Sequence, residues 1–139
     1  MIQYINESVE MPALPKQKIS NWIKQTSAFY DKKMGDIAYI FCTDERILEI
    51  NKQYLQHDYY TDIITFDYTE KKRISGDIFI SIETVDSNAK KFNVSFKHEL
   101  LRIIIHGILH LCGQEDKTPE AKEEMTRKEN VALEQYARL

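Results

Sequence analysis

The stretch from Lys97 to Cys112 constrains the fold more than any other part of the sequence. It is apolar on almost every side of a helix, and it stops at Gly113. Glycine suits the left-handed conformation that closes many helices. A helix that is hydrophobic all round has to lie inside a protein. The sequence therefore predicts a buried central helix over 97–112.

Other segments alternate between helical and strand-like patterns. Apolar residues at helical spacing predict helices, whereas short runs rich in β-branched and aromatic residues predict strands. Two of the expected strands, Ile63–Tyr68 and Ile74–Ile82, flank a polar loop, Thr69–Arg73, so we expect them to pair as a hairpin. Asp77 follows Gly76 and is expected to hold a turn at a strand start. The expected strands are Met1–Ile5, Asp36–Cys42, Ile63–Tyr68 and Ile74–Ile82, and the other expected helices are Lys16–Tyr30, Thr43–Tyr54, Glu83–Phe92 and Pro119–Arg138, the last with an apolar stripe of Met125, Val131, Leu133 and Tyr136.

Size and composition indicate an ordinary globular protein. A chain of 139 residues suits one domain, over 1–139, and has no apolar run long enough for a membrane helix. The start of the chain does not resemble a secretory signal, and Cys42 and Cys112 form no disulfide framework. We therefore expect a soluble, cytoplasmic protein. Its net charge of −3 argues against a protein that coats nucleic acid through bulk positive charge.

His106 and His110 lie four residues apart in the predicted central helix. This spacing puts both imidazoles on nearly the same face, where they can converge on one metal ion. Glu115 or Asp116, just past Gly113, could supply a third ligand from the returning loop. Three protein ligands would leave a position for water, which is typical of catalytic zinc sites. The alternative is that both histidines are core residues hydrogen-bonded to backbone or carboxylate groups.

A metalloprotease would carry a glutamate directly after the first histidine as its general base. This chain has Gly107 at that position. A mid-helix glycine costs about 1 kcal/mol relative to alanine, but it lets another group approach closely. The glycine therefore argues against a peptidase.

The segment His106-Gly107-Ile108-Leu109-His110-Leu111-Cys112-Gly113 resembles the signature of the YbeY family, bacterial metal-dependent endoribonucleases of ribosomal RNA maturation. The resemblance covers about residue 40 to the end of the chain. The other blocks that resemble the family, in its order, are Asn51–Tyr54, Thr61–Phe66, Gly76–Ser81, Glu99–Leu101 and Glu124–Met125.

The resemblance implies a zincin-like α+β fold, with a small mixed four-stranded sheet packed among helices around the metal-binding helix. It also implies one zinc ion and single-strand-specific RNA cleavage, linked to the 3′ end of 16S ribosomal RNA and to ribosome quality control. Ribosomal RNA, the small ribosomal subunit and its associated proteins are the implied partners.

The chain departs from the family pattern at two positions. Asp116 stands where the family usually has a third histidine, and carboxylate oxygen is also a zinc ligand. Leu55 stands where the family usually has an arginine, which would suit a phosphate. We expect His57, two residues further on, to substitute for that arginine in part.

The sequence thus predicts an endoribonuclease with metal ligands His106, His110 and Asp116. It does not identify the general base; His57 and Asp62 are the candidates, and Asp62 could instead orient a metal-bound histidine or serve as a polar residue at a strand start. Either water or the RNA 2′-hydroxyl could attack the phosphorus. Two alternatives remain: another zinc metallohydrolase, such as a peptidase, or a non-catalytic ribosome-assembly factor with a structural metal.

Overall fold

The computed structural model describes residues 1–55 and 61–139. Helices and strands follow one another almost as the sequence patterns predict. In chain order the described elements are β1 (Ile2–Asn6), α1 (Lys16–Phe29), β2 (Lys33–Cys42), α2 (Asp44–Ile50), a π-helical turn (Asn51–Leu55), β3 (Ile63–Asp67), β4 (Arg73–Ser81), α3 (Ile82–Lys91), α4 (Phe96–Leu111) and α5 (Pro119–Ala137).

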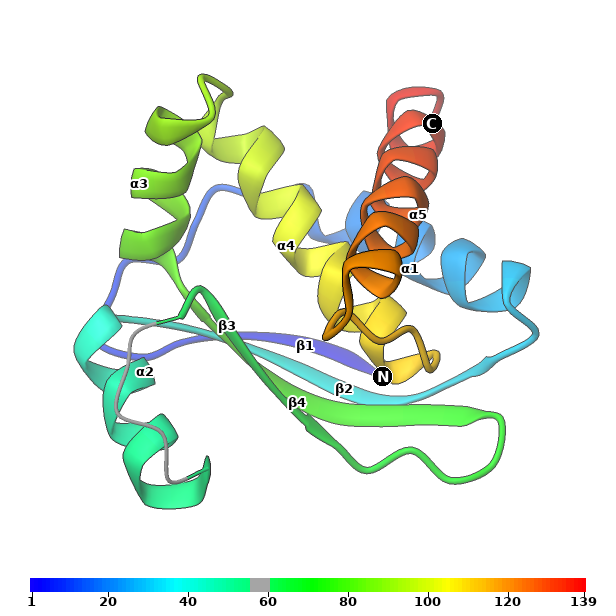
Figure 1. Ribbon diagram of the computed structural model, residues 1–139, viewed down its shortest axis with the longest axis horizontal. Helices are drawn as coiled ribbons and strands as arrows, with labels where there is room; N and C mark the ends of the chain where they lie inside the picture. Colours follow the sequence, from blue (N-terminus) through cyan, green and yellow to red (C-terminus); the bar gives the residue numbers. More distant parts are fainter. Residues whose placement is uncertain (56–60) are drawn as a thin grey trace.

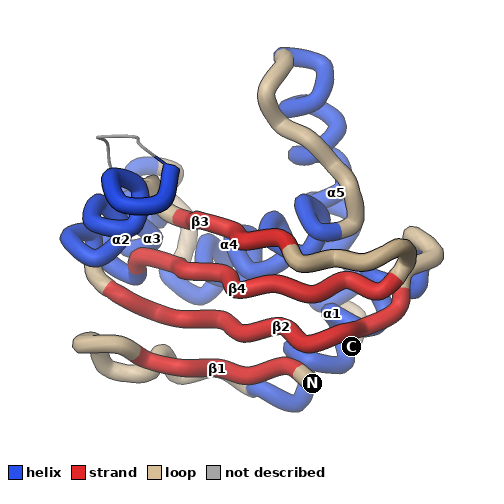
Figure 2. Tube along the Cα trace, turned by 90° about the horizontal axis from the view of Figure 1, so that it is seen from below, coloured by secondary structure: helices blue, strands red, loops and turns tan. Residues whose placement is uncertain are grey.

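The four described strands form one mixed sheet in the order β1-β2-β4-β3. The pairs β1–β2 and β2–β4 are parallel, whereas β3 pairs antiparallel with β4 as the predicted hairpin. Figure 2 shows that β3 and β1 lie at opposite edges of the sheet. Among the described strands, β3 therefore pairs with β4 alone.

The central helix α4 lies on the sheet, with α1, α3 and α5 on the same side (Figure 1). The core between them is built from the alternate strand residues that face the helices and from most of α4. This arrangement confirms the predicted α+β fold, with a mixed four-stranded sheet and a buried central helix. The strand residues on this face with almost no exposure are Ile37, Tyr39, Phe41, Ile74, Ile78 and Ile80.

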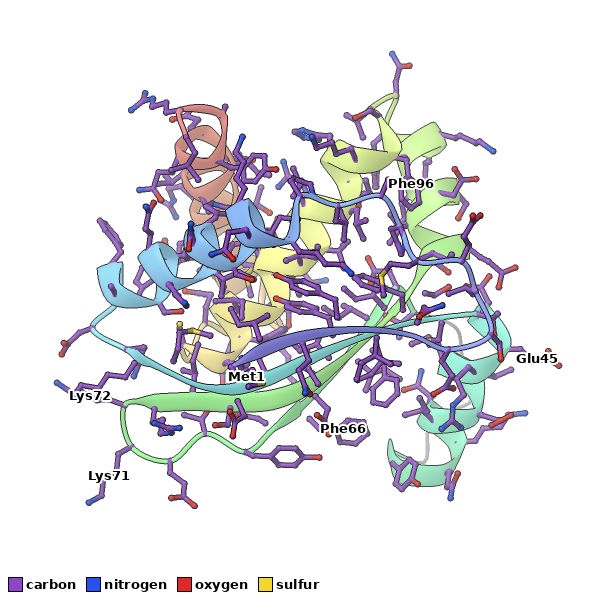
Figure 3. All side chains as sticks on the ribbon, turned by 180° about the vertical axis from the view of Figure 1, so that it is seen from behind. Met1, Glu45, Phe66, Lys71, Lys72 and Phe96 are labelled. Carbon is purple, nitrogen blue, oxygen red and sulfur yellow. The ribbon has the colours of Figure 1, made fainter. Side chains whose placement is uncertain are left out.

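Helix α2 lies on the other side of the sheet, at one end (Figure 1). Its Ile47 and Ile50 form a second small cluster with Cys42 and Ile64. Phe66 packs against this cluster and projects from the sheet away from α4 (Figure 3). Helices α4 and α2 therefore cover opposite faces of β3.

Several predicted boundaries and roles are wrong. Strand β2 begins at Lys33 rather than Asp36, so Gly35 lies within it. Glycine is needed at this position because a Cβ there would come 2.5 Å from the carbonyl oxygen of Ile74. Asp77 lies in the middle of β4 and accepts a 3.3 Å hydrogen bond from the Tyr68 hydroxyl, so it holds no turn. The helix predicted to reach Tyr54 changes to a π-helical turn at Asn51.

Among the described residues, no helix has both the length and the apolar character needed to span a membrane.

We expect neither thiol to react while the protein is folded. Burial raises the pKa of Cys42 to about 12 and that of Cys112 to about 11. A thiol of pKa 11 is about 0.1% thiolate at pH 8, against about a quarter for an ordinary cysteine, and the thiolate is the reactive form. Alkylation by iodoacetamide at pH 8 should therefore be at least about 100-fold slower than in the urea-unfolded protein. Equal rates in the two states would contradict the burial of Cys42 and the partial burial of Cys112.

Candidate metal centre

The C-terminal half of α4 presents two histidines on one face. The rings of His106 and His110 lie 4.8 Å apart between centroids, at an angle of 85°. Gly107, between them in sequence, faces the sheet, where a Cβ would lie 3.1 Å from Ile78 Cδ1 and 3.2 Å from Ile63 Cδ1. The glycine therefore lets α4 approach β3 and β4 closely, as its position in the sequence predicted.

A glycine turn returns the chain to these histidines. Gly113 has φ of 101°, and its N–H donates to the His110 carbonyl while that of Gln114 donates to the Leu109 carbonyl. This pair of bonds is the Schellman motif, which satisfies the last carbonyls of a helix. A Cβ on Gly113 would meet nothing within 4 Å, so the glycine serves the backbone angle rather than close packing. The turn carries Asp116 back over the end of α4.

Asp116 completes a triangle of ligand atoms. One of its carboxylate oxygens, Oδ2, lies 3.4 Å from His106 Nε2 and 3.4 Å from His110 Nε2. The three potential ligand atoms all lie within 4.8 Å of one another. In a tetrahedral zinc site with bonds of about 2.0–2.1 Å, neighbouring ligand atoms are about 3.3–3.4 Å apart. The two distances to Asp116 Oδ2 match this spacing, so two imidazole nitrogens and one carboxylate oxygen surround a position that a metal ion could take.

Glu129, from α5, holds the other ring nitrogen of His106. Its Oε2 lies 2.6 Å from His106 Nδ1, and its Oε1 accepts a 2.8 Å hydrogen bond from Arg102. Arg102 also donates to Asn130 at 2.8 Å. Carboxylates in this position behind a histidine typically orient metal ligands.

The two histidines have opposite pKa shifts. Burial alone would lower the pKa of His106, but the hydrogen bond and charge of Glu129, with Asp116 and Asp62, raise it above the ordinary value. Burial and the neighbouring His106 lower the pKa of His110, although Asp116 partly opposes them. Negative charge is therefore concentrated behind and beside His106, where a cation would be stabilised.

The carboxyl groups of Asp62 and Glu99 both interact electrostatically with Glu129. Asp62 accepts hydrogen bonds of 3.4 Å from Thr61 and Asn88, and burial raises its pKa while the charge of His106 opposes this. Glu99 is only 4% exposed, and burial raises its pKa despite Arg102. Asp62 thus lies near the histidines, whereas the carboxylate hydrogen-bonded to His106 is Glu129.

A cleft of about 630 Å³ opens over these residues. Its walls come from β3, the end of α4, the returning loop and α5, and they are both polar and apolar. Lys117, next to Asp116, is exposed at this cleft and adds a positive charge. The residues that line it are Asn51, Thr61, Asp62, Ile63, Ile64, Thr65, Asp67, Arg102, Ile103, His106, His110, Leu111, Asp116, Lys117 and Glu129.

The structure brings together His106, His110 and Asp116, and places Asp62 in the same cleft. His57 and the side chain of Leu55 lie outside the described residues. Sequence analysis missed Glu129 because it lies 23 residues from His106 in the chain.

A signal for Glu129 was present in α5. The buried face of this helix consists of Met125, Glu129, Ala132 and Tyr136, whereas Val131, predicted on the apolar stripe, is 43% exposed. The spacing 125, 129, 132, 136 is that of a single helix face, so a charged residue stands among apolar ones. A buried charge needs a partner, which marks Glu129 as unusual.

Comparisons with known proteins find relatives over nearly the whole chain. The family model described as "Endoribonuclease YbeY" matches residues 2–137. A protein of Phocaeicola vulgatus named "Endoribonuclease YbeY" is 59% identical over 133 residues, covering 96% of both chains. A protein of the same name from Parabacteroides distasonis is 59% identical and covers 95% of this chain and 93% of its own.

The fold is also similar to a solved structure. The solution structure of TM1509 from Thermotoga maritima has a TM-score of 0.67 and 26% identity, and the match covers 98% of this chain and 89% of that one. The sequence and fold comparisons extend over nearly the whole chain, beyond the part where motifs alone carried the resemblance. The chain belongs to the YbeY family of endoribonucleases.

Proposed function

We propose that this endoribonuclease cuts single-stranded RNA with one zinc ion held by His106, His110 and Asp116. The observation that carries the proposal is the 3.4 Å approach of both histidine Nε2 atoms to a single oxygen of Asp116. When bound, zinc would polarise a phosphate oxygen and lower the pKa of a bound water to about 7. The side chains of all three ligands are partly exposed to the cleft, so substrate can reach them.

Other residues of the cleft fit the needs of RNA cleavage. The carboxyl group of Asp62 is our candidate to take the proton from the attacking hydroxyl, with His57 as the second candidate. Lys117 offers a cation for the scissile phosphate, and Arg102 lines the cleft although it also pairs with Glu129. We propose that these cations, together with His57, take the role of the arginine that the family usually has where this chain has Leu55.

The proposed substrate is ribosomal RNA, cut in maturation of the 3′ end of 16S rRNA and in ribosome quality control. Family membership supports this proposal, since the relatives are named as endoribonucleases. The net charge of −3 indicates weak binding to free RNA. We therefore propose that the small ribosomal subunit and its proteins recruit the enzyme, which acts in the cytoplasm as one domain over 1–139.

A peptidase on the same helix geometry is less well supported. The general base of such a peptidase follows the first histidine directly, and Gly107 there faces Ile78 and Ile63 at close range. A non-catalytic assembly factor with a structural metal is the other alternative. The partly exposed ligands and the cleft above them favour catalysis, because structural zinc sites are closed by four protein ligands.

The test combines metal content with RNA cleavage. Elemental analysis should find about one zinc per chain. The zinc-loaded protein should cut a fluorescent single-stranded RNA from the 3′ region of 16S rRNA and spare its duplex, and chelation should stop cleavage. Cyclic phosphate ends with 5′-hydroxyl partners would show attack by the 2′-hydroxyl, and 5′-phosphate ends would show attack by water. Cleavage of casein but not RNA, or no cleavage by zinc-loaded protein, would overturn the proposal.

Substitution of Asp62 by asparagine should test whether Asp62 accepts the proton without binding the metal. We expect cleavage to slow by about 10²–10⁴-fold, the usual contribution of general base catalysis, with zinc content unchanged. Asp36→Asn, at an exposed position in β2, should cleave at the normal rate. If Asp62→Asn cleaves normally while His57→Ala is slow and keeps its zinc, the base is His57 instead.

A further inference from the structure

A chain of hydrogen bonds runs behind His106, between α4 and α5, which lie side by side (Figure 1). It begins at Asn130, passes through Arg102 and reaches Glu129, with 2.8 Å at each step. The last bond, 2.6 Å, joins Glu129 Oε2 to His106 Nδ1. The Glu129 side chain is only 8% exposed, so water does not compete strongly for these atoms.

The chemistry of the two partners fixes where the proton lies. An ionised carboxylate can only accept hydrogen bonds, so His106 Nδ1 must carry a proton to bind Glu129. A neutral imidazole protonated at Nδ1 keeps its lone pair on Nε2. Nε2 is the nitrogen that lies 3.4 Å from Asp116 in the candidate metal centre.

We propose that Glu129 is a positioning residue that selects the tautomer of His106, and that Arg102 sets the orientation of Glu129. The proposal rests on the proposed metal centre, because its consequence is a lone pair on Nε2 directed at the metal position. Arg102 matters because a guanidinium only donates hydrogen bonds. Arg102 therefore donates to an oxygen of residue 129, and the other terminal atom of residue 129 faces His106 Nδ1.

This arrangement predicts an unusual result for Glu129→Gln. The amide oxygen of Gln would bind Arg102, since the amide nitrogen cannot accept. The amide nitrogen would then donate to His106 Nδ1, and the ring proton would move to Nε2. A nearly isosteric change would thus reverse the tautomer and remove the lone pair from the metal position.

Removal of Arg102 should reverse the effect. In the double variant Arg102→Met/Glu129→Gln, no guanidinium holds the amide oxygen. The amide can rotate, accept from His106 Nδ1 and restore the lone pair on Nε2. A second substitution that improves metal binding is not expected from a purely structural role of Glu129.

The experiment measures the ring proton and zinc affinity separately. NMR of metal-free, ¹⁵N-histidine-labelled protein at pH 8.5 reports whether His106 Nδ1 carries a proton, and competition with a chelator gives zinc affinity. Wild type and Glu134→Gln, an exposed control on α5, should show the Nδ1 proton. Glu129→Gln should lose it and bind zinc about 10–100-fold more weakly, the usual effect of losing such a partner.

The double variant should regain the Nδ1 proton and at least tenfold in zinc affinity over Glu129→Gln. A Glu129→Gln protein with an intact Nδ1 proton and wild-type affinity would overturn the role of Glu129. Failure of the folded double variant to recover would overturn the role of Arg102. If Glu129→Gln alone does not fold, comparison of the double variant with Arg102→Met/Glu129→Leu decides, since leucine cannot accept a hydrogen bond.

Failure of the metal centre itself would look different. Wild-type protein without zinc affinity would overturn the proposed function, whereas the Nδ1 proton of the metal-free protein would still test the bond to Glu129.

Discussion

Replacement of Asp116 by alanine is expected to abolish stable zinc binding and to slow RNA cleavage at least about 10³-fold. Of the three candidate ligands among the described residues, the variant keeps His106 and His110, whereas catalytic zinc sites use three from the protein. Loss of a metal that supplies several kcal/mol of transition-state stabilisation corresponds to about three or more decades in rate. Elemental analysis and the single-stranded RNA assay measure the two effects on the same samples.

Two variants control this prediction. Asp116→His should retain zinc and cleavage, because imidazole is an equally good zinc ligand and the family resemblance leads us to expect histidine here. Glu115→Ala, at the exposed position just before Asp116, should leave both properties unchanged. One zinc per chain and a normal rate in Asp116→Ala would show that Asp116 is no ligand.

The sequence predicted the fold well where periodicity was strong. The all-round apolar character of α4 correctly indicated a central buried helix, because so much apolar surface can only be covered from several sides. The hairpin of β3 and β4 was also predicted correctly, since two strand-like runs flank a short polar loop. Both patterns are local and can be seen without knowing the tertiary structure.

The errors came where neighbours in space decide the local structure. The strand expected to start at Asp36 begins at Lys33, and close contact with Ile74 of the neighbouring strand requires glycine at position 35 inside β2. Asp77 looked like a turn residue, but the pairing of β4 with both β2 and β3 extends the strand through it. The pairing of β2 with β4 joins residues about 40 positions apart, such as Ala38 and Asp77, and pairing over that distance leaves little signal in a single sequence.

The same contrast between local patterns and long-range contacts holds for the candidate site. The candidate ligands His106, His110 and Asp116 lie within eleven residues. Helix geometry and one glycine turn predicted that Glu115 or Asp116 would return to the two histidines, and the family resemblance indicated Asp116. Glu129 reaches His106 only because α5 packs against α4. Contacts between separate helices depend on the whole fold, which explains why sequence analysis missed this residue.

Trp22→Ala is expected to destabilise the protein by about 3–5 kcal/mol, the usual cost of removing a buried tryptophan. The indole of Trp22 has no exposure, and its N–H donates a 2.8 Å hydrogen bond to the Ala132 carbonyl of α5. Its ring also contacts Tyr136 edge-on at 4.9 Å between centroids. Urea unfolding followed by far-ultraviolet circular dichroism measures the change, since Trp22 is the only tryptophan and fluorescence is lost with it.

Two further variants separate packing from hydrogen bonding. Trp22→Phe keeps much of the ring volume but leaves the Ala132 carbonyl without its donor, and should cost about 1–3 kcal/mol. Phe29→Ala, at a 68% exposed position on α1, should change stability by less than about 0.5 kcal/mol. A loss below about 1 kcal/mol for Trp22→Ala would contradict this packing. Because Trp22 fixes α5, which carries Glu129, a Trp22→Ala protein that still folds should also bind zinc more weakly.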